Sequence, residues 1–426
     1  MNGVIIFTLL LVLMLTGMPV SIALGLTVLT FLFTLTQVPL ESVALKLFTG
    51  IENFEVMAIP FFILAGNFLT HGGVAKRMIN FASSMVGHWY GGLGLGGVLA
   101  CALFAAVSGS SPATVVAIGS ILMPAMVQAG FPKRFGAGVI TTSGALGILI
   151  PPSIVMVMYA VATNTSIGAL FMAGVVPGIA LALLLGGVTW YRARKNNYPR
   201  LPRRSWLERW RAFREAIWGL LLVVVVMGGI YSGIFTPTEA AAMSAVYAFF
   251  VAVFVYKDLT LKQVPRVLLN SANMSAMLLY IITNAVMFSF ILANENIPQG
   301  LGNWMVAQGL GTISFLLACN VILLVAGNFM EPSSIVLIFA PILFPVAMRL
   351  GIDPVHFGIM MVVNMEVGMC HPPVGLNLYV ASGITKMGIT ELTVAVWPWL
   401  LAMLGFLGVV TYWPALSLWL PHLLLK

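Results

Sequence analysis

The sequence predicts an all-helical protein that crosses a membrane many times. Of its 426 residues, 60% are hydrophobic and only 8% are charged, whereas a soluble chain carries about 25% charged residues. So few charged side chains cannot cover a water-facing surface, and lipid must therefore cover much of the protein. The apolar residues form about a dozen continuous runs, unlike the short alternating segments of a membrane β-barrel.

Each apolar run predicts a membrane helix, although several runs are shorter than the ~20 residues that span a bilayer. The first run is interrupted at Gly17–Pro19, so residues 4–34 could cross the membrane once or twice. The later runs cover residues 60–69, 97–107, 137–161, 170–191, 217–230, 240–256, 274–292, 315–326, 335–348, 359–363 and 394–420.

A basic segment separates the chain into two halves. Nine of the 20 Lys and Arg residues lie between Arg192 and Arg214, and the positive-inside rule places this segment in the cytoplasm. In a membrane protein such a cluster indicates topology rather than nucleic-acid binding. Trp206 and Trp210 recur at helical spacing and predict an amphipathic helix at the interface. The predicted divisions are a first half (1–191), a linker (192–216) and a second half (217–426).

The two halves repeat the same landmarks at a nearly constant separation. Ser108–Pro112 matches Asn328–Pro332, and the prolines 151–152 match the prolines 372–373, at separations of 220 and 221 residues. Repeats of this kind are typical of secondary transporters, whose halves are commonly inverted. Three further matches lie 221 or 222 residues apart: Pro124 with Pro345, Pro132 with Pro354, and Gly136 with Gly358.

Polar, proline-bearing breaks inside apolar sequence predict a re-entrant hairpin and a broken helix in each half. Proline lacks the backbone N–H and disfavours helical geometry in the preceding residue, so backbone carbonyl groups near each break are freed. Freed backbone groups at membrane depth are tolerated only where they line a cavity or bind something. We therefore predict a site for a Na⁺-like cation and an anionic solute at these breaks. The predicted hairpins are residues 97–127 and 315–349, and the predicted broken helices are residues 136–161 and 356–381.

Eight segments carry a resemblance to a known family, and they follow one another over the whole chain. They are residues 58–66, 108–114, 147–153, 170–178, 233–240, 327–332, 351–354 and 372–378. Together they resemble the large membrane subunit of tripartite ATP-independent periplasmic (TRAP) transporters, and most of all its C4-dicarboxylate branch.

The resemblance implies an elevator-type, Na⁺-coupled transporter of the bacterial inner membrane. Its hairpins and broken helices would move as a transport domain against a scaffold, with arm helices at residues 74–90 and 258–272. The implied partners are a small four-helix membrane subunit, a periplasmic binding protein, membrane lipid and a small carboxylate solute. A C4-dicarboxylate is the expected solute, and sialic acid or another sugar acid is the alternative.

The resemblance also implies two Na⁺ sites, one at the breaks of each half. Some family members carry Asp in place of Thr114, and many carry Thr in place of His371, so the sequence departs from the family pattern at these two positions. The first site would use Ser108 and Thr114 with carbonyl groups near Gly147, Ile150 and Pro152. The second would use Gly327 and Asn328 with carbonyl groups near Gly368, His371 and Pro373.

Hydroxyl and amide groups near the breaks are the candidates for binding the solute. They are Ser110, Ser111, Ser153 and Asn377. Ionisable residues inside a membrane are functional candidates by default. Glu331 could balance the charge of a cation or begin a helix, and Glu366 could accept a hydrogen bond or contact the scaffold. The three cysteines show neither metal-type nor disulfide-type spacing.

Two other functional classes are alternatives to secondary transport. The permease of an ATP-driven importer would need a separate nucleotide-binding subunit, because the sequence contains no G-x-x-x-x-G-K-[S/T] loop. A membrane enzyme would need a catalytic constellation, and neither H-E-x-x-H nor G-x-S-x-G occurs. The sequence therefore predicts a transporter and no enzymatic activity.

Overall fold

The computed structural model describes residues 2–34, 39–49, 52–308 and 311–424. These residues form helices and their connections, and no β-strand occurs among them. Within this part of the chain, eight helices are long and apolar enough to cross a membrane. The prediction of an all-helical polytopic membrane protein is therefore confirmed.

The first half contains mostly short helices, several of which end at a glycine. Two 3₁₀ segments, η1 (Phe54–Met57) and η2 (Gly144–Ile148), adjoin α4 and α8. The helices are α1 (Asn2–Leu15), α2 (Val20–Thr34), α3 (Leu40–Thr49), α4 (Ala58–His71), α5 (Val74–Val86), α6 (Gly92–Ser108), α7 (Ser111–Gln128), α8 (Lys133–Ser143), α9 (Ile154–Thr163) and α10 (Ile167–Lys195).

The second half contains the longest helix, and local sequence signals fix where two of its helices start. Capping boxes at Ser205–Glu208 and Thr236–Glu239 satisfy free backbone N–H groups at the starts of α11 and α12. A π-helical turn, η3 (Val251–Val255), follows α12. The helices are α11 (Trp206–Tyr231), α12 (Pro237–Phe250), α13 (Val264–Asn294), α14 (Ile297–Ala307), α15 (Thr312–Gly327), α16 (Pro332–Arg349), α17 (Pro354–Cys370), α18 (Leu376–Thr385), α19 (Ile389–Tyr412) and α20 (Ala415–Leu424).

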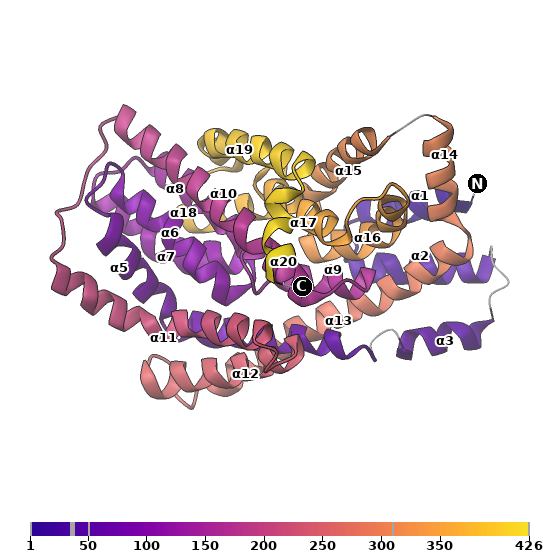
Figure 1. Cartoon of the computed structure of the whole chain (residues 1–426), viewed down its shortest axis with the longest axis horizontal. Coiled ribbons are helices and arrows are strands. Elements are labelled where there is room, and N and C mark those ends of the chain that lie inside the picture. The colour runs from indigo at the N-terminus through magenta and orange to yellow at the C-terminus, as the bar shows by residue number, and fades with distance from the viewer. Residues whose placement is uncertain (1, 35–38, 50–51, 309–310, 425–426) are drawn as a thin grey trace.

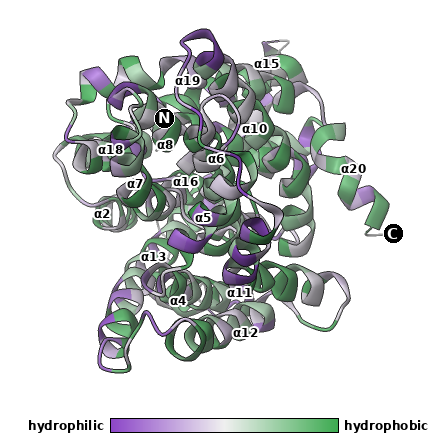
Figure 2. Ribbon diagram, turned by 90° about the vertical axis from the view of Figure 1, so that its left-hand side faces the viewer, coloured by the Kyte–Doolittle hydropathy of each residue, from purple (hydrophilic) through white to green (hydrophobic). Residues whose placement is uncertain are grey.

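The helices form a layer with a second, more compact group of helices packed on it (Figure 1). In the layer, α12 packs against α4 and α11, while α13 packs against α2 and α4. In the second group, α6, α7, α8 and α18 pack together, and α9, α15, α16 and α17 lie beside them. The helices α10 and α19 contact both parts of this second group. Figure 2 shows hydrophobic residues along most of the helices, as a lipid-embedded protein requires.

Residues 4–34 form two helices rather than one. Gly17 has a positive φ of 82°, a conformation that glycine adopts without steric cost. Pro19 follows, and α2 starts at Val20. The two helices pack against each other, so this stretch turns back on itself.

The predicted linker and the second predicted arm have different boundaries in the structure. Helix α10 continues to Lys195 and α11 starts at Trp206, so only residues 196–205 lie between helices. The predicted interfacial helix forms the first turns of the 26-residue helix α11, because nothing interrupts the helix after its capping box. Residues 258–272 do not form a separate helix either. From Val264 onward they belong to the 31-residue helix α13, which places its proline in the first turn, where proline is tolerated.

Candidate functional site

The connection between α6 and α7 brings two hydroxyl groups and a carbonyl group together. Ser108 Oγ lies 2.8 Å from Thr114 Oγ1. Both hydroxyls also approach the carbonyl oxygen of Ser110, at 3.2 and 2.8 Å. Gly109 between them has a positive φ of 58°, which lets the chain reverse within two residues. The break therefore gathers the hydroxyl oxygens of two residues expected at the first cation site, Ser108 and Thr114, and the carbonyl oxygen of Ser110, a residue expected to bind the solute.

The first broken helix lies directly against this connection. A Cβ atom added to Gly147 would lie 2.6 Å from the carbonyl oxygen of Ser110, and one added to Gly109 would lie 3.0 Å from that of Pro152. Only glycine permits backbones to approach this closely. Ser108, Thr114, Gly147 and Pro152 are thus brought together across a separation of about forty residues. The side chain of Ile150, whose carbonyl group was expected at the same site, contacts α10 at Gly178.

The second half brings its corresponding breaks together in the same way. A Cβ atom added to Gly327 would lie 2.9 Å from the Cα atom of Gly368. Asn328 accepts a hydrogen bond at its carbonyl oxygen from the Gly375 N–H at 3.3 Å, and its Oδ1 lies 3.0 Å from His371 Nδ1. The second site therefore differs from the first, because an imidazole nitrogen already contacts its amide oxygen.

A buried polar junction connects the two halves. The Asn377 amide nitrogen donates to Ser111 Oγ at 2.8 Å and to the Thr141 carbonyl oxygen at 3.4 Å. Cys370 Sγ donates to the same carbonyl at 3.5 Å and accepts from Asn377 at 3.7 Å. The side chains of Ser111, Thr141, Cys370 and Asn377 are completely buried. The junction fixes the start of α7 against α8, α17 and α18.

The four predicted solute residues have different surroundings. Ser111 and Asn377 satisfy each other within the junction. Ser153 is also buried, donates to the Ile148 carbonyl oxygen at 2.6 Å and caps α9. Ser110 is half-buried and lies at the connection between α6 and α7. Of the four, only Ser110 retains an accessible surface at the breaks.

The two intramembrane carboxylates also differ. Glu331 precedes α16 and accepts a hydrogen bond from the Ser333 hydroxyl at 2.6 Å, which supports the alternative that it begins a helix. Glu366 is completely buried, and neither of its oxygen atoms has a hydrogen-bond partner in the described part of the chain. The structure therefore does not support the expectation that Glu366 accepts a structural hydrogen bond.

Thr141 and Cys370 belong to the junction, but the sequence did not single them out. Thr141 begins a short polar stretch, Thr141–Ser143, which follows the apolar residues of α8 and ends that helix. That stretch is a signal, because hydroxyl side chains in such a helix commonly bond within the protein. Cys370 carried no comparable signal, since a lone cysteine is usually an ordinary buried residue.

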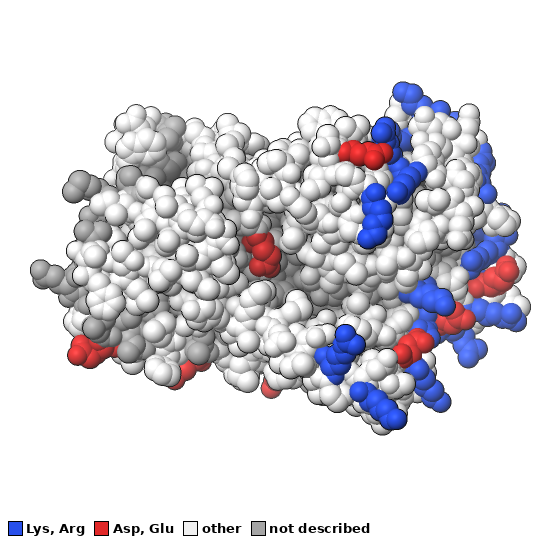
Figure 3. Space-filling view, turned by 180° about the vertical axis from the view of Figure 1, so that it is seen from behind, with Lys and Arg blue, Asp and Glu red and all other residues white. Residues whose placement is uncertain are grey.

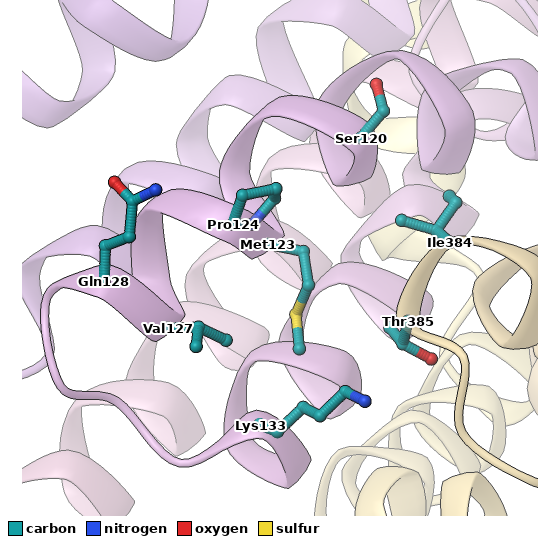
Figure 4. Close-up of a pocket in the computed structure, with 8 residues that line it drawn as sticks. All are labelled: Ser120, Met123, Pro124, Val127, Gln128, Lys133, Ile384 and Thr385. Carbon is teal, nitrogen blue, oxygen red and sulfur yellow. The ribbon is translucent and has the colours of Figure 1, made fainter.

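A surface cavity of about 470 Å³ lies beside the end of α18 (Figure 4). It is lined from α7 by Ser120, Met123 and Val127, among others, and by Lys133 at the start of α8. The lining residues on α7 begin at Ser120, about two and a half turns beyond Ser111. Ser108 and Ser111 are not among them.

Comparison with known proteins reveals an extensive similarity to one family. Residues 7–416 match the family described as "Tripartite ATP-independent periplasmic transporter, DctM component". The chain is 77% identical to the C4-dicarboxylate TRAP transporter large permease protein DctM of Rhodobacter capsulatus, with 100% of both chains covered. It is 56% identical to the protein of that name from Pseudomonas aeruginosa, with 90% of each covered.

The chain is less similar to a permease named for another solute and to a transporter of solved structure. The chain is 37% identical to the sialic acid TRAP transporter large permease protein SiaM of Vibrio cholerae, with 97% of each covered. The crystal structure of the Alcanivorax borkumensis YdaH transporter is 15% identical, with 89% of each chain covered and a TM-score of 0.64. At that identity the likeness concerns the fold alone. The relatives named above are transporter permeases, in agreement with the prediction that the chain is not an enzyme.

Proposed function

The chain belongs to the DctM component family of tripartite ATP-independent periplasmic transporters, and from this membership we propose that it carries a C4-dicarboxylate across the bacterial inner membrane. The observation that supports this solute most directly is the full-length identity of 77% to the Rhodobacter capsulatus C4-dicarboxylate permease. Identity to the sialic acid permease is about half as high. A sugar acid is therefore the second candidate.

Transport by this chain is proposed to require two partners, in keeping with the tripartite family. A periplasmic binding protein delivers the solute, and a small membrane subunit completes the membrane part. Uptake should be measured in proteoliposomes that contain both membrane subunits, with radioactive succinate and an added binding protein. Full uptake without the binding protein would contradict this arrangement, and preferred uptake of sialic acid over succinate would favour the second candidate.

Na⁺ is the proposed coupling ion, and the first break supports this choice best. Ser108 and Thr114 place their hydroxyl oxygens 2.8 Å apart, close to the carbonyl oxygen of Ser110. The carbonyl oxygen of Pro152 lies against Gly109 in the same region. Hydroxyl and carbonyl oxygens of an interrupted membrane helix are the groups that coordinate Na⁺ in secondary transporters. The residues present therefore fit this cation.

The second break is proposed as a weaker Na⁺ site. Gly327 and Asn328 lie against Gly368 and His371, whose carbonyl groups supply further oxygen atoms. The contact between Asn328 Oδ1 and His371 Nδ1 must open before that amide oxygen can bind a cation. The two sites should therefore differ in their affinity for Na⁺.

An elevator movement is proposed for the hairpins and broken helices, which pack together on the layer of α2, α4, α11, α12 and α13. A cavity of about 320 Å³ lies between α13, α9 and α16 and is lined mainly by apolar side chains. An apolar boundary that is incompletely packed suits sliding, because few hydrogen bonds need to break.

Substitution of Ser108 by alanine, or of Asn328 by alanine, should weaken the dependence of uptake on Na⁺. Losing a hydrogen-bonding oxygen that faces a charged group costs about 1.5–3 kcal/mol, so the half-saturating Na⁺ concentration should rise about tenfold or more. The measurement is succinate uptake as a function of external Na⁺. Ser120→Ala is the matched control, because Ser120 lies on the same helix as Thr114 but lines the surface cavity. Unchanged Na⁺ titrations in both site variants would reject the proposed sites.

A further inference from the structure

A small pocket with an excess of positive charge lies where the chain enters α11. It has a volume of about 350 Å³ and is lined by Arg203, Arg204, Ser205, Trp206 and Arg209. Figure 3 shows that Lys and Arg side chains gather at one end of the molecule, while most of the remaining face is uncharged. The pocket belongs to the segment that carries the densest positive charge of the chain.

Several N–H donors at this pocket or beside it are buried without an acceptor. Nε and Nη2 of Arg209, and Nδ1 of His88, have no hydrogen-bond partner among the described residues. Trp89 Nε1 donates to His88 Nε2 at 3.0 Å, so neutral His88 carries its proton on Nδ1. A buried donor without a partner costs about 1–3 kcal/mol. An acceptor-rich ligand would therefore be strongly favoured here.

The protein neutralises these cations only in part. The carboxylate of Glu208 accepts from Ser205 N at 2.7 Å and from Ser205 Oγ at 2.8 Å in the capping box, and it interacts electrostatically with Arg204. Arg204 donates to the uncharged side chain of Asn80. The ion pairs found among the described residues, Arg77–Asp258 and Arg134–Glu391, do not involve the pocket. The three arginines that line the pocket therefore keep an excess of positive charge.

The ionisation of His88 reflects this charge. Its pKa lies below the ordinary value, mainly because of partial burial and further because of Arg209 and Arg203. Both arginines therefore act on the imidazole. An anion bound among the arginines would oppose their lowering of the His88 pKa.

We propose that this pocket binds the phosphate group of an anionic phospholipid. Arginine pairs with phosphate oxygens through two parallel N–H bonds, which matches the free Nε and Nη2 of Arg209. The surrounding side chains favour lipid over free phosphate. Trp206, Leu207 and Trp210 are 77%, 58% and 51% exposed, and tryptophan is enriched at the level of lipid headgroups.

The position of the pocket along the chain supports the same ligand. Helix α11 continues from the pocket into a candidate membrane span, so a headgroup at Arg209 would have acyl chains beside the apolar part of that helix. Basic pockets at the ends of membrane helices are suited to anionic headgroups. The lipid would fix the start of α11 at the membrane surface.

Native mass spectrometry of the purified full-length chain tests the proposal. The probes are phosphatidylglycerol and phosphatidylcholine with the same acyl chains, and millimolar inorganic phosphate as a separate competitor. The wild-type chain should retain phosphatidylglycerol in preference to phosphatidylcholine. Arg209→Gln should weaken phosphatidylglycerol binding about fivefold, the loss expected for one basic side chain near anionic lipid.

Two further variants separate this site from general surface charge. Arg211→Gln removes the same charge from the same helix at an exposed position outside the pocket, and it should leave binding nearly unchanged. Arg203→Gln alters an exposed residue that lines the pocket, and it should weaken binding as Arg209→Gln does. Equal losses for Arg211→Gln and Arg209→Gln would overturn the proposal. So would equal retention of the two lipids, or displacement of the lipid by inorganic phosphate.

Discussion

Replacing Gly147 with alanine should reduce uptake by about tenfold or more while the protein still inserts into the membrane. The added Cβ atom would lie 2.6 Å from the Ser110 carbonyl oxygen, 2.7 Å from the Ser110 carbonyl carbon and 2.8 Å from the Ser111 Cα atom. These are backbone atoms, so no side-chain rotation can relieve the overlap. Overpacking of this kind costs about 1–3 kcal/mol, and here it would push the α6–α7 connection away from the broken helix. Uptake per inserted molecule and thermal stability should both be measured.

Gly187→Ala is the control for that variant. A Cβ atom at Gly187 meets nothing within 4 Å, and alanine favours the helix by about 1 kcal/mol over glycine. Uptake should therefore be preserved. Gly327→Ala tests the second half, because its Cβ atom would lie 2.9 Å from the Gly368 Cα atom. Wild-type uptake in Gly147→Ala would show that the close approach of the two breaks is not needed for transport.

Replacing Asn377 with leucine should lower the stability of the protein more than any single surface substitution. The amide connects Ser111 to the Thr141 carbonyl oxygen inside a completely buried junction. Leucine has the same branching and the same number of side-chain heavy atoms but offers no hydrogen bond, so it leaves the Ser111 hydroxyl without its partner. Each buried polar group left unsatisfied costs about 1–3 kcal/mol. A decrease in the melting temperature in detergent is the expected result, and Asn196→Ala on the exposed end of α10 is the control.

A double-mutant cycle would show whether the junction acts as a unit. Ser111→Ala removes the other partner, so the combined variant should be less destabilised than the sum of the two single variants. Additive losses would mean that Asn377 stabilises the protein through contacts other than Ser111. The same cycle measured by uptake would show whether the junction also contributes to transport.

Local signals predicted the helices and their interruptions, because proline and glycine act through the backbone. The connections at residues 109–110 and 328–331 fall in segments whose proline and glycine residues predict them. The sequence did not predict that α11 runs without interruption from Trp206 to Tyr231, and the reason is related. Its first turns are amphipathic and its later turns are uniformly apolar, so the composition changes where the backbone does not. The hydrophobic pattern of a helix indicates whether water or lipid surrounds it, whereas the capping residues indicate where it begins and ends.

Contacts between residues that lie far apart in the sequence were harder to predict. Ser111 and Asn377 were both selected as solute-binding groups, yet the structure pairs them with each other across 266 residues. A polar side chain inside a membrane protein must find a partner, but the sequence does not show whether that partner is a ligand or another side chain. The pairing of His371 with Asn328 illustrates the same difficulty.

The burial of all three cysteines has a practical consequence for measuring movement. Cys101, Cys319 and Cys370 carry free thiols that are essentially inaccessible to solvent. A thiol introduced at an exposed position should therefore react selectively with a maleimide dye in the native background. Removing Cys370 to obtain a cysteine-free chain would instead disturb its contacts with Thr141 and Asn377. Fluorescent pairs for single-molecule distance measurements can thus be attached without altering the buried junction.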